Sequence, residues 1–237
     1  DIYKIKRFIN KNGINIIHAH GKGASLICRI VKLLTNKPLI YTYHGIHLSC
    51  HNSFYKLFYL IYENVTSILD TVKIFVSKSE KQYAKDSFIN FGSKNIIINN
   101  GVINKKIKEY SIIKKSVSKK KIEVISVCRF VQQKNIREII NIAYKLQSIN
   151  FTIVGDGPDF NFIKNYVKDL DLDNVFLIGR SNNVFDYLYK SDIYLSTSIY
   201  EGLPLSILEA MSIGLPIVAS NVIGNKDTIR HSSSGYL

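Results

Sequence analysis

The stretch SIYEGLPLSILEAMSIGLPIVAS, residues 198–220, places two acidic residues around a Gly-Leu-Pro turn. Glu201 lies in the turn, and Glu209 lies in the helix that the turn opens. Pro204 fits a first helical turn, where its missing N–H would have had no intrahelical partner, and apolar residues then recur at helical spacing. Because a strand-like segment precedes the turn, its backbone N–H groups form a predicted anion site at the carboxyl end of a strand. A phosphorylated ligand is the natural candidate.

A structural explanation of the two acids stays open at this point. Glu201 can serve as an N-terminal charge favoured by the helix dipole, and Glu209 as a solvated helix residue. The order of the preceding segments favours a functional role, because VISVCRFVQQKN, FTIVGDGP and NVFLIGR come before this element at domain-scale spacing.

This succession resembles the C-terminal domain of retaining glycosyltransferases of family 4, which have the GT-B fold. Glu201 and Glu209 match the family's E-x7-E signature, and Arg129 and Lys134 match the arginine and lysine of its G-R-x4-K-G element. Asn135 stands where the family has the second glycine, and asparagine tolerates left-handed or capping geometry. The resemblance covers most of the 237 residues and implies an α/β protein with two Rossmann-like domains facing across a cleft.

Strand-like and helix-like segments alternate along the chain, which is typical of parallel α/β sheets. The resemblance implies an acceptor-side domain at 1–103 that lacks its first strand, and a nucleotide-sugar-binding domain at 121–237 that lacks its last helices. The chain is thus expected to be truncated at both ends. The basic segment 104–120 has no clean periodicity and is the predicted linker. Helices are expected near 24–34, 54–69, 80–91 and 184–189, after Asn135 and Pro158, and from Leu205.

The composition agrees with a soluble two-domain enzyme, since 46% of the residues are hydrophobic. No segment is long and apolar enough to span a bilayer, and the amphipathic start of the chain does not read as a signal peptide. Cys28, Cys50 and Cys128 are an odd and widely separated set, which supports neither a disulfide framework nor a metal knuckle. A reducing, cytoplasmic compartment is therefore predicted.

The net charge of +14 raises a nucleic-acid hypothesis. The charge is mostly lysine, however, and it is spread along the chain with a single dense run at 105–121. No compact recognition motif or aromatic-interleaved arginine cluster accompanies it, so no nucleic-acid partner is predicted. Peripheral contact with the anionic inner face of the cell membrane, worth about 1 kcal/mol per basic residue, suits an enzyme with a lipid-linked acceptor.

Arg129 and Lys134 are the candidate cations for a diphosphate. A nucleotide-sugar donor carries a diphosphate leaving group that gains negative charge as the glycosidic bond breaks, and fixed cations near it lower the barrier. Arginine offers a planar fork for phosphate oxygens and lysine a point charge. The resemblance assigns donor binding to both positions, whereas without it an exposed surface pair is the default explanation.

The resemblance also assigns roles to the E-x7-E element. Glu209 corresponds to the acid that accepts hydrogen bonds from the ribose hydroxyls, which its two oxygens suit. Glu201 corresponds to the acid that faces the donor sugar, and it is not assigned as a nucleophile. The backbone N–H groups expected to bind sugar hydroxyls and phosphate belong to Gly202, Leu203, Leu205 and Ser206.

Weaker signals complete the predicted donor site. Gly155 opens a GDGP turn whose glycines allow close backbone approach, although the motif alone is weak and a plain turn is the favoured explanation. Gly179 and Arg180 stand where the family's main chain meets the nucleobase. His44 matches a histidine that reaches the donor sugar, and the turn Asn100-Gly101 is read as structural.

A metal site formed by His18, His20, His44 and His47 is a further interpretation, because imidazoles are ordinary metal ligands. No matched carboxylate or thiolate cluster accompanies these histidines, and the resembling family needs no metal for catalysis. No metal and no separate cofactor are therefore predicted.

The predicted function is transfer of a sugar from a nucleotide-diphosphate sugar, with UDP as the first candidate, to a glycan or lipid-linked acceptor. The resemblance associates this reaction with bacterial cell-surface polysaccharide, such as capsule or lipopolysaccharide. Two alternatives remain: a nucleotide-sugar epimerase with Rossmann-like halves, and a non-catalytic partial remnant that only binds nucleotide.

Overall fold

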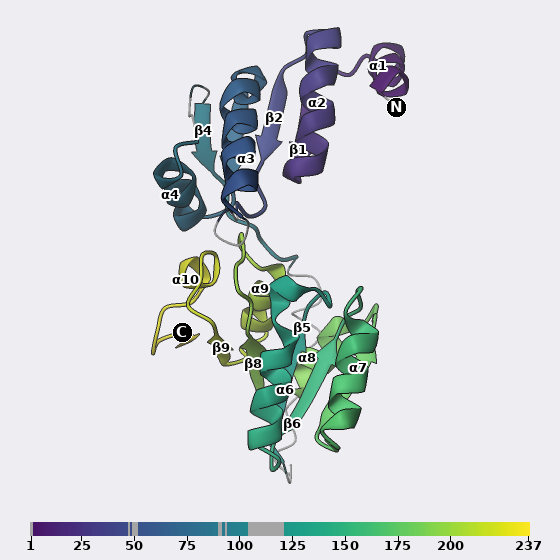
Figure 1. Cartoon of the computed structure of the whole chain (residues 1–237), viewed down its shortest axis with the longest axis vertical. Coiled ribbons are helices and arrows are strands. Elements are labelled where there is room, and N and C mark those ends of the chain that lie inside the picture. The colour runs from purple at the N-terminus through teal and green to yellow at the C-terminus, as the bar shows by residue number, and fades with distance from the viewer. Residues whose placement is uncertain (1, 47, 49–51, 90–91, 93, 104–120) are drawn as a thin grey trace. The chain divides into compact units, whose positions relative to one another are not determined.

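The computed structural model describes the chain except for residues 1, 47, 49–51, 90, 91, 93 and 104–120 (Figure 1). The chain divides into two compact units, Asp1–Asn100 and Gly101–Leu237, here called unit 1 and unit 2. The predicted linker 104–120 lies outside the described residues, as do His47 and Cys50. No helix in the described part of the chain combines the length and apolar composition needed to cross a bilayer.

Unit 1 is built around a four-stranded parallel sheet in the order β1-β2-β3-β4. Its core lies between this sheet and its helices and includes the fully buried Leu39 and Tyr43, whose ring stacks on Phe75 with centroids 4.9 Å apart. The elements are α1 (Ile2–Lys11), β1 (Ile17–His20), α2 (Gly21–Thr35), β2 (Leu39–Thr42), α3 (Ser53–Thr66), the 3-10 turn η1 (Ser67–Leu69), β3 (Val72–Phe75), α4 (Lys78–Asp86) and β4 (Lys94–Ile97).

Unit 2 contains a six-stranded parallel sheet in the order β10-β9-β8-β5-β6-β7. The strand order reverses direction between β8 and β5, and such a switch point is where open α/β sheets bind ligands. The elements are β5 (Glu123–Val127), the 3-10 turn η2 (Gln132–Lys134), α6 (Ile136–Lys145), β6 (Asn150–Val154), α7 (Phe160–Asp169), β7 (Val175–Gly179), α8 (Val184–Lys190), β8 (Ile193–Ser196), α9 (Leu205–Ser212), β9 (Ile217–Ala219), α10 (Asn225–Thr228) and β10 (Gly235–Tyr236).

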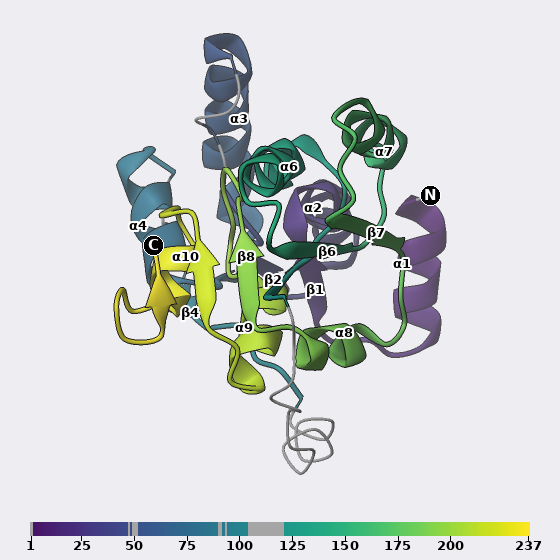
Figure 2. The same ribbon diagram turned by 90° about the horizontal axis from the view of Figure 1, so that it is seen from below.

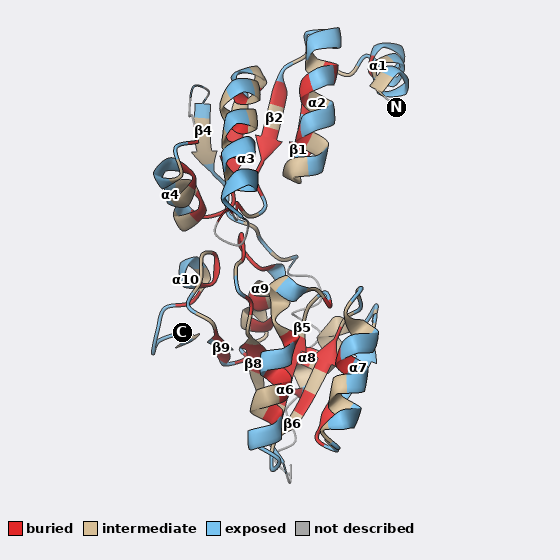
Figure 3. Cartoon of the chain, viewed as in Figure 1, coloured by how far each residue is buried: buried red, intermediate tan, exposed pale blue. Residues whose placement is uncertain are grey.

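Helices cover both faces of the unit 2 sheet (Figure 2). On one face α6 and α7 bury Ile140 and Ile163 against strands β5, β6 and β7. On the other face α8 and α9 bury Leu188 and Ile207. The central strands β5, β6 and β8 contain no exposed residue (Figure 3), which explains why they read as apolar runs rather than as alternating patterns.

The expected alternation of strands and helices is confirmed, with two local corrections. The helix expected at 80–91 begins at Lys78, because the Ser77 side chain caps it, and ends at Asp86. Pro204 lies before α9 rather than in its first turn, because its ψ of 117° is extended and the helix begins at Leu205. The structure adds α10 and the two-residue strand β10, which no sequence pattern indicated.

Candidate active site

The loops that follow β5, β6 and β7 are held together at the carboxyl edge of the unit 2 sheet. The Cys128 N–H donates to the Val154 carbonyl at 3.0 Å, and the Gly155 N–H donates to the Gly179 carbonyl at 2.9 Å. Parallel strands deliver all three loops to this edge. The predicted Gly155 and Gly179 therefore lie in one continuous backbone surface.

Glycine is required at the turn after β6. Gly155 has φ +142°, and a Cβ on it would lie 1.9 Å from the Cys128 carbonyl oxygen. At Gly157 a Cβ would lie 2.4 Å from the Phe130 carbonyl oxygen. Since neither backbone oxygen can move cheaply, the GDGP turn packs against the loop after β5 as only glycines allow.

These three loops surround a cavity of about 520 Å³. Arg129 from the loop after β5, Gly155 from the loop after β6 and Arg180 from the loop after β7 all line it. Arg129 and Arg180 are both exposed, and both line the wall of this cavity. The structure thus brings three of the predicted donor-site residues to one concave surface with positive charge.

Lys134 and Glu201 form an ion pair in which the lysine ammonium donates to the Glu201 carboxylate. Their side chains are only 18% and 8% exposed, so the pair is largely desolvated. Hydrogen bonds hold the two loops together, since Thr197 Oγ1 donates to the Lys134 carbonyl at 3.0 Å and the Gln133 amide donates to the Tyr200 carbonyl at 2.8 Å. Lys134 is therefore not an exposed surface lysine.

Asn135 adopts the left-handed conformation, with φ 48° and ψ 47°. It replaces the glycine of the resembling family without loss of that geometry, as expected from the tolerance of asparagine for this region. The turn that carries Lys134 into α6 is consequently intact.

The turn around Glu201 is packed, and its predicted backbone donors differ in accessibility. Gly202 and Leu203 are buried, Ser206 is half-buried and Leu205 is exposed at the start of α9. The hydroxyls of Ser206 and Tyr194 lie 2.8 Å apart, and the Tyr194 hydroxyl also reaches the Val127 carbonyl at 3.2 Å. Burial raises the pKa of Tyr194, so its hydroxyl stays neutral.

Glu209 projects from α9 and is half-buried, and burial raises the pKa of its carboxyl group. Within the described residues its carboxylate has no hydrogen-bond or ion-pair partner. A partly desolvated acceptor without a protein donor is suited to bind hydroxyl groups of a ligand. Glu209 is therefore not a fully solvated helix residue.

Two residues of this region were missed by the sequence analysis. Gly224 has φ +86°, and a Cβ on it would lie 2.6 Å from the Gly202 carbonyl oxygen and 3.0 Å from Glu201 Cβ. Tyr194, fully buried in β8, joins β5 to α9 through its hydroxyl. A glycine after a predicted strand was the only available signal for the first, and nothing in the pattern distinguished Tyr194 from a core aromatic.

His44 belongs to unit 1, where it follows β2. Its Nε2 lies 2.9 Å from His20 Nδ1, and His18 Nε2 lies 2.8 Å from Thr42 Oγ1. Burial first, and neighbouring imidazoles second, lower the pKa of His18 and of His44. Among the residues that the structure describes, no group of three or more His, Cys, Asp or Glu side chains has the arrangement to hold a metal.

Family models match both halves of the chain. The model described as "Glycosyl transferases group 1" matches residues 108–237, and the model "Glycosyltransferase Family 4" matches residues 1–105. The group 1 match spans more than half of the chain and contains both members of the Lys134–Glu201 pair.

Similar proteins include the UDP-Gal:alpha-D-GlcNAc-diphosphoundecaprenol alpha-1,3-galactosyltransferase of Escherichia coli, which is 29% identical over 252 residues, covering 100% of this chain and 65% of the relative. The O-antigen biosynthesis glycosyltransferase WbnH of Escherichia coli is 27% identical over 94% of this chain and 63% of its own length. The chain therefore spans slightly less than two thirds of these relatives.

Among solved structures, Anabaena Alr3699/HepE in complex with UDP and glucose superposes with a TM-score of 0.82 at 19% identity, covering 100% of this chain and 66% of that one. Sucrose-phosphate synthase from Thermosynechococcus elongatus gives the same TM-score at 18% identity. This likeness confirms the predicted GT-B fold class. With both halves matched and the E-x7-E residues in place on the α9 turn, the chain belongs to the group 1 glycosyltransferases.

Proposed function

We propose that this protein is a retaining glycosyltransferase, which moves a sugar from a nucleotide-diphosphate sugar to a glycan or lipid-linked acceptor in cell-surface polysaccharide synthesis. The observation that carries the proposal is the desolvated Lys134–Glu201 pair, held at the same sheet edge as the cavity that Arg129 lines. Two cations and an acid at a sheet switch point suit an anionic donor with a hydroxylated sugar.

The donor diphosphate is assigned to the cavity wall. Arg129 supplies a planar fork for phosphate oxygens, and Gly155 lets the turn after β6 pack against the loop that carries Arg129. Lys134 supplies a second positive charge where the leaving group becomes more negative. Because the leaving group is stabilised by these side chains, the proposed reaction needs neither a metal nor a separate cofactor.

The sugar and ribose hydroxyls are assigned to the two acids. Glu209 has acceptor oxygens with no protein donor in the described part of the chain, and these suit the ribose hydroxyls. Glu201, oriented by Lys134, faces the donor sugar and is not used as a nucleophile. Backbone N–H groups of Gly202, Leu203, Leu205 and Ser206 are assigned to sugar hydroxyls and phosphate, Arg180 and Gly179 to the nucleobase, and His44 to the sugar.

UDP is the proposed nucleotide, since a relative is named for UDP-Gal and a structural neighbour was solved with UDP. The name of the same relative contains a diphosphoundecaprenol acceptor, which supports a lipid-linked acceptor and a place of action at the inner face of the cell membrane. Family membership argues against the epimerase alternative. The non-catalytic remnant remains as an outcome of the test.

The test is a thermal-shift titration of the purified chain with UDP, GDP, ADP and CMP. A ligand that binds only the folded state adds about 2.7 kcal/mol at a hundredfold excess over its dissociation constant. We expect a selective shift with UDP, which is lost in Arg129→Ala and retained in Arg230→Ala, a matched exposed arginine of unit 2 outside the cavity. A folded chain that shows no shift with any nucleotide would contradict the proposal.

Glu209→Ala separates ribose binding from a structural role. We expect the affinity for UDP to fall by about ten- to a hundredfold, since one carboxylate that accepts two hydroxyl bonds contributes about 1.5–3 kcal/mol. Glu138→Ala, on the exposed face of α6, is the matched control. Equal UDP affinity in Glu209→Ala and the parent chain would remove the ribose assignment. Glu201→Ala is expected chiefly to reduce sugar transfer, and UDP binding without any transfer by the parent chain would identify the remnant.

A further inference from the structure

Helix α3 exposes its apolar side chains and buries its acid. We call the α3 face the side chains that recur at helical spacing on its outer side and continue into η1: Phe54, Leu57, Phe58, Ile61, Val65 and Ile68. All are exposed, and Phe54, Phe58 and Val65 are 81%, 67% and 66% exposed. Glu63, on the opposite side, is fully buried. The inner side also packs Tyr59, Leu60 and Tyr62 on the core, so α3 is apolar on both sides and its outer apolar side is uncovered in unit 1.

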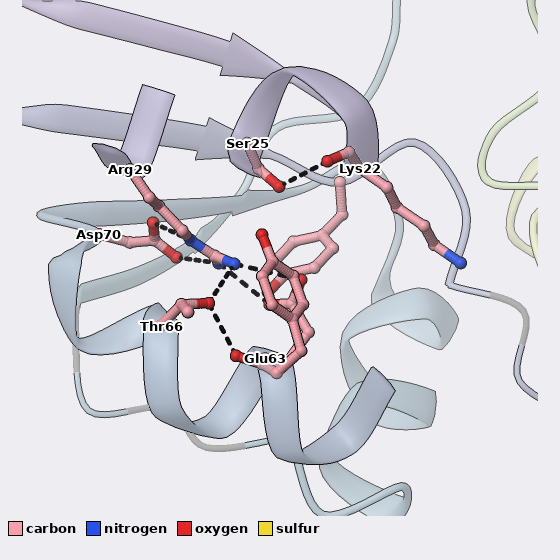
Figure 4. Close-up of polar contacts among 8 residues, drawn as sticks. Lys22, Ser25, Arg29, Glu63, Thr66 and Asp70 are labelled. Atoms are coloured by element: carbon pink, nitrogen blue, oxygen red, sulfur yellow. Dashed lines mark hydrogen bonds and ion pairs between the residues drawn. The ribbon is translucent and has the colours of Figure 1, made fainter. Parts of the chain in front are cut away.

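A buried ionic cluster explains how α3 is held in this orientation (Figure 4). The Arg29 guanidinium on α2 lies 3.0 Å from Glu63 and 2.7 Å from Asp70, and it also donates to Thr66 Oγ1 at 2.8 Å. The Tyr43 hydroxyl donates to Glu63 at 3.1 Å. These polar contacts fix the inner side of α3 against unit 1, so its outer apolar side chains contribute nothing to the core of the unit.

Phe88, after α4, extends the apolar surface. It is 84% exposed and has φ +59°, a left-handed conformation that is unfavourable for a bulky residue. The Asn64 amide on α3 donates to the Phe88 carbonyl at 3.1 Å, so this residue lies beside the helix. An exposed aromatic in a strained conformation next to an apolar helix face indicates a surface that is used for contact.

The described surface of unit 1, to which the α3 face belongs, is strongly cationic. In the described part of unit 1 the acids Glu63, Asp70 and Glu80 are buried, and Asp86 is the one exposed acid. The exposed cations there include Lys4, Arg7, Lys11, Lys78, Lys85 and Lys94. Lys22 lies over the Tyr59 ring of α3 at 4.5 Å, which adds a cation at the side of the helix.

We propose that the α3 face docks on the surface of an anionic phospholipid bilayer. Aromatic and aliphatic side chains on one side of a helix, in a unit whose exposed charges are almost all positive, match the composition of interfacial helices that insert into the headgroup region. A second copy of the chain is disfavoured as the occupant, because it would bring two cationic surfaces together. The inference rests on the proposed function in one respect, since a lipid-linked acceptor requires the enzyme to work at a membrane.

The experiment is co-sedimentation of the chain with phosphatidylcholine vesicles that contain or lack phosphatidylglycerol, at low and at high salt. We expect retention on the anionic vesicles that weakens at high salt. The variant Leu57→Ser/Phe58→Ser/Ile61→Ser should partition more than about tenfold less, given the apolar area removed. A variant with the same residue types exposed elsewhere, Leu33→Ser/Phe176→Ser/Ile122→Ser, should bind as the parent does.

Three results would overturn the inference. They are no retention of the folded parent chain on anionic vesicles, equal retention of the α3-face variant, and a parent dimer in light scattering that the α3-face variant abolishes. UDP titration of the same proteins separates this inference from the proposed function. If the α3-face variant loses vesicle binding and still binds UDP, the docking role is confirmed. If the parent chain binds vesicles but does not bind UDP, the proposed donor site alone is contradicted.

Discussion

Replacing Lys134 with methionine tests whether the Lys134–Glu201 pair organises the candidate active site. Methionine keeps most of the length of the side chain and removes the ammonium, so the Glu201 carboxylate, 8% exposed, loses its cation. Removing one partner of a fully buried pair costs about 3–5 kcal/mol, whereas an exposed pair contributes about 0–1 kcal/mol. With 18% exposure at Lys134, we expect a loss of about 2 kcal/mol in the stability of unit 2.

A double-mutant cycle isolates the interaction from other effects of the substitution. Glu201→Gln is expected to cost about 1.5 kcal/mol, because it leaves the ammonium desolvated, and the combined variant about 2 kcal/mol rather than the sum of both. The coupling energy is therefore about 1.5 kcal/mol. Lys164→Met, at an exposed position of α7, is the control and should stay within about 0.5 kcal/mol of the parent.

Amide hydrogen exchange of peptides from β8 and α9 is the assay, because it reports the stability of unit 2 separately from that of unit 1. Thermal unfolding should show the same ranking, with a decrease of roughly 5–10 °C for Lys134→Met. Strict additivity of the two single substitutions would refute the reasoning, since it would mean that the ammonium and the carboxylate do not interact in solution.

Three further predictions concern groups whose environment is equally defined. Gly155→Ala should destabilise unit 2 by about 3 kcal/mol in thermal unfolding, because its Cβ would lie 1.9 Å from a backbone oxygen at positive φ, whereas Gly23→Ala, in α2 with open space around it, should not destabilise unit 1, because alanine favours a helix over glycine. Arg29→Met should cost unit 1 about 3–5 kcal/mol in urea unfolding, since it leaves buried carboxylates unpaired, and the exposed Arg7→Met should have little effect. His18 has a lowered pKa in the folded state, so below its ordinary value of 6.5 the unfolded chain binds more protons and the free energy of unfolding falls. In His18→Asn this fall should be smaller, and a parent chain whose stability rises on acidification would contradict the assignment.

The fold was predictable because strand and helix segments differ in period and length along this chain. Apolar runs such as those of β3 and β6 are bounded by turns, and the helices between them carry apolar stripes, so the alternation is visible without any tertiary information. The boundaries were less accurate, because they depend on single capping events such as the Ser77 side chain at the start of α4. The roles assigned to the site residues stay predictions.

The missed parts of the candidate site depend on contacts between distant segments. Gly224 approaches the Gly202 carbonyl only after β9 and the α9 turn are in place, so its requirement for glycine is a property of the tertiary structure. Tyr194 likewise acquires its role from the positions of Val127 and Ser206. Local sequence patterns identify Gly224 as a turn glycine and Tyr194 as a core aromatic. Their contacts with distant segments of the chain decide what each residue does.

Helix α3 shows the same limit with a larger consequence. Its sequence, SFYKLFYLIYENVT, has an apolar stripe that predicts a helix correctly, and the natural expectation is that this stripe faces the core. The burial of Glu63 reverses that expectation, because the Arg29 guanidinium on α2 and the hydroxyl of Tyr43 supply its partners inside unit 1. Glu63, together with Tyr59, Leu60 and Tyr62, therefore forms the inner side of the helix and leaves the outer apolar side uncovered in unit 1. For an enzyme proposed to act on a lipid-linked acceptor, an apolar outer face on a cationic unit assigns the proposed membrane contact to a specific element, where substitutions are expected to change docking without touching the donor site.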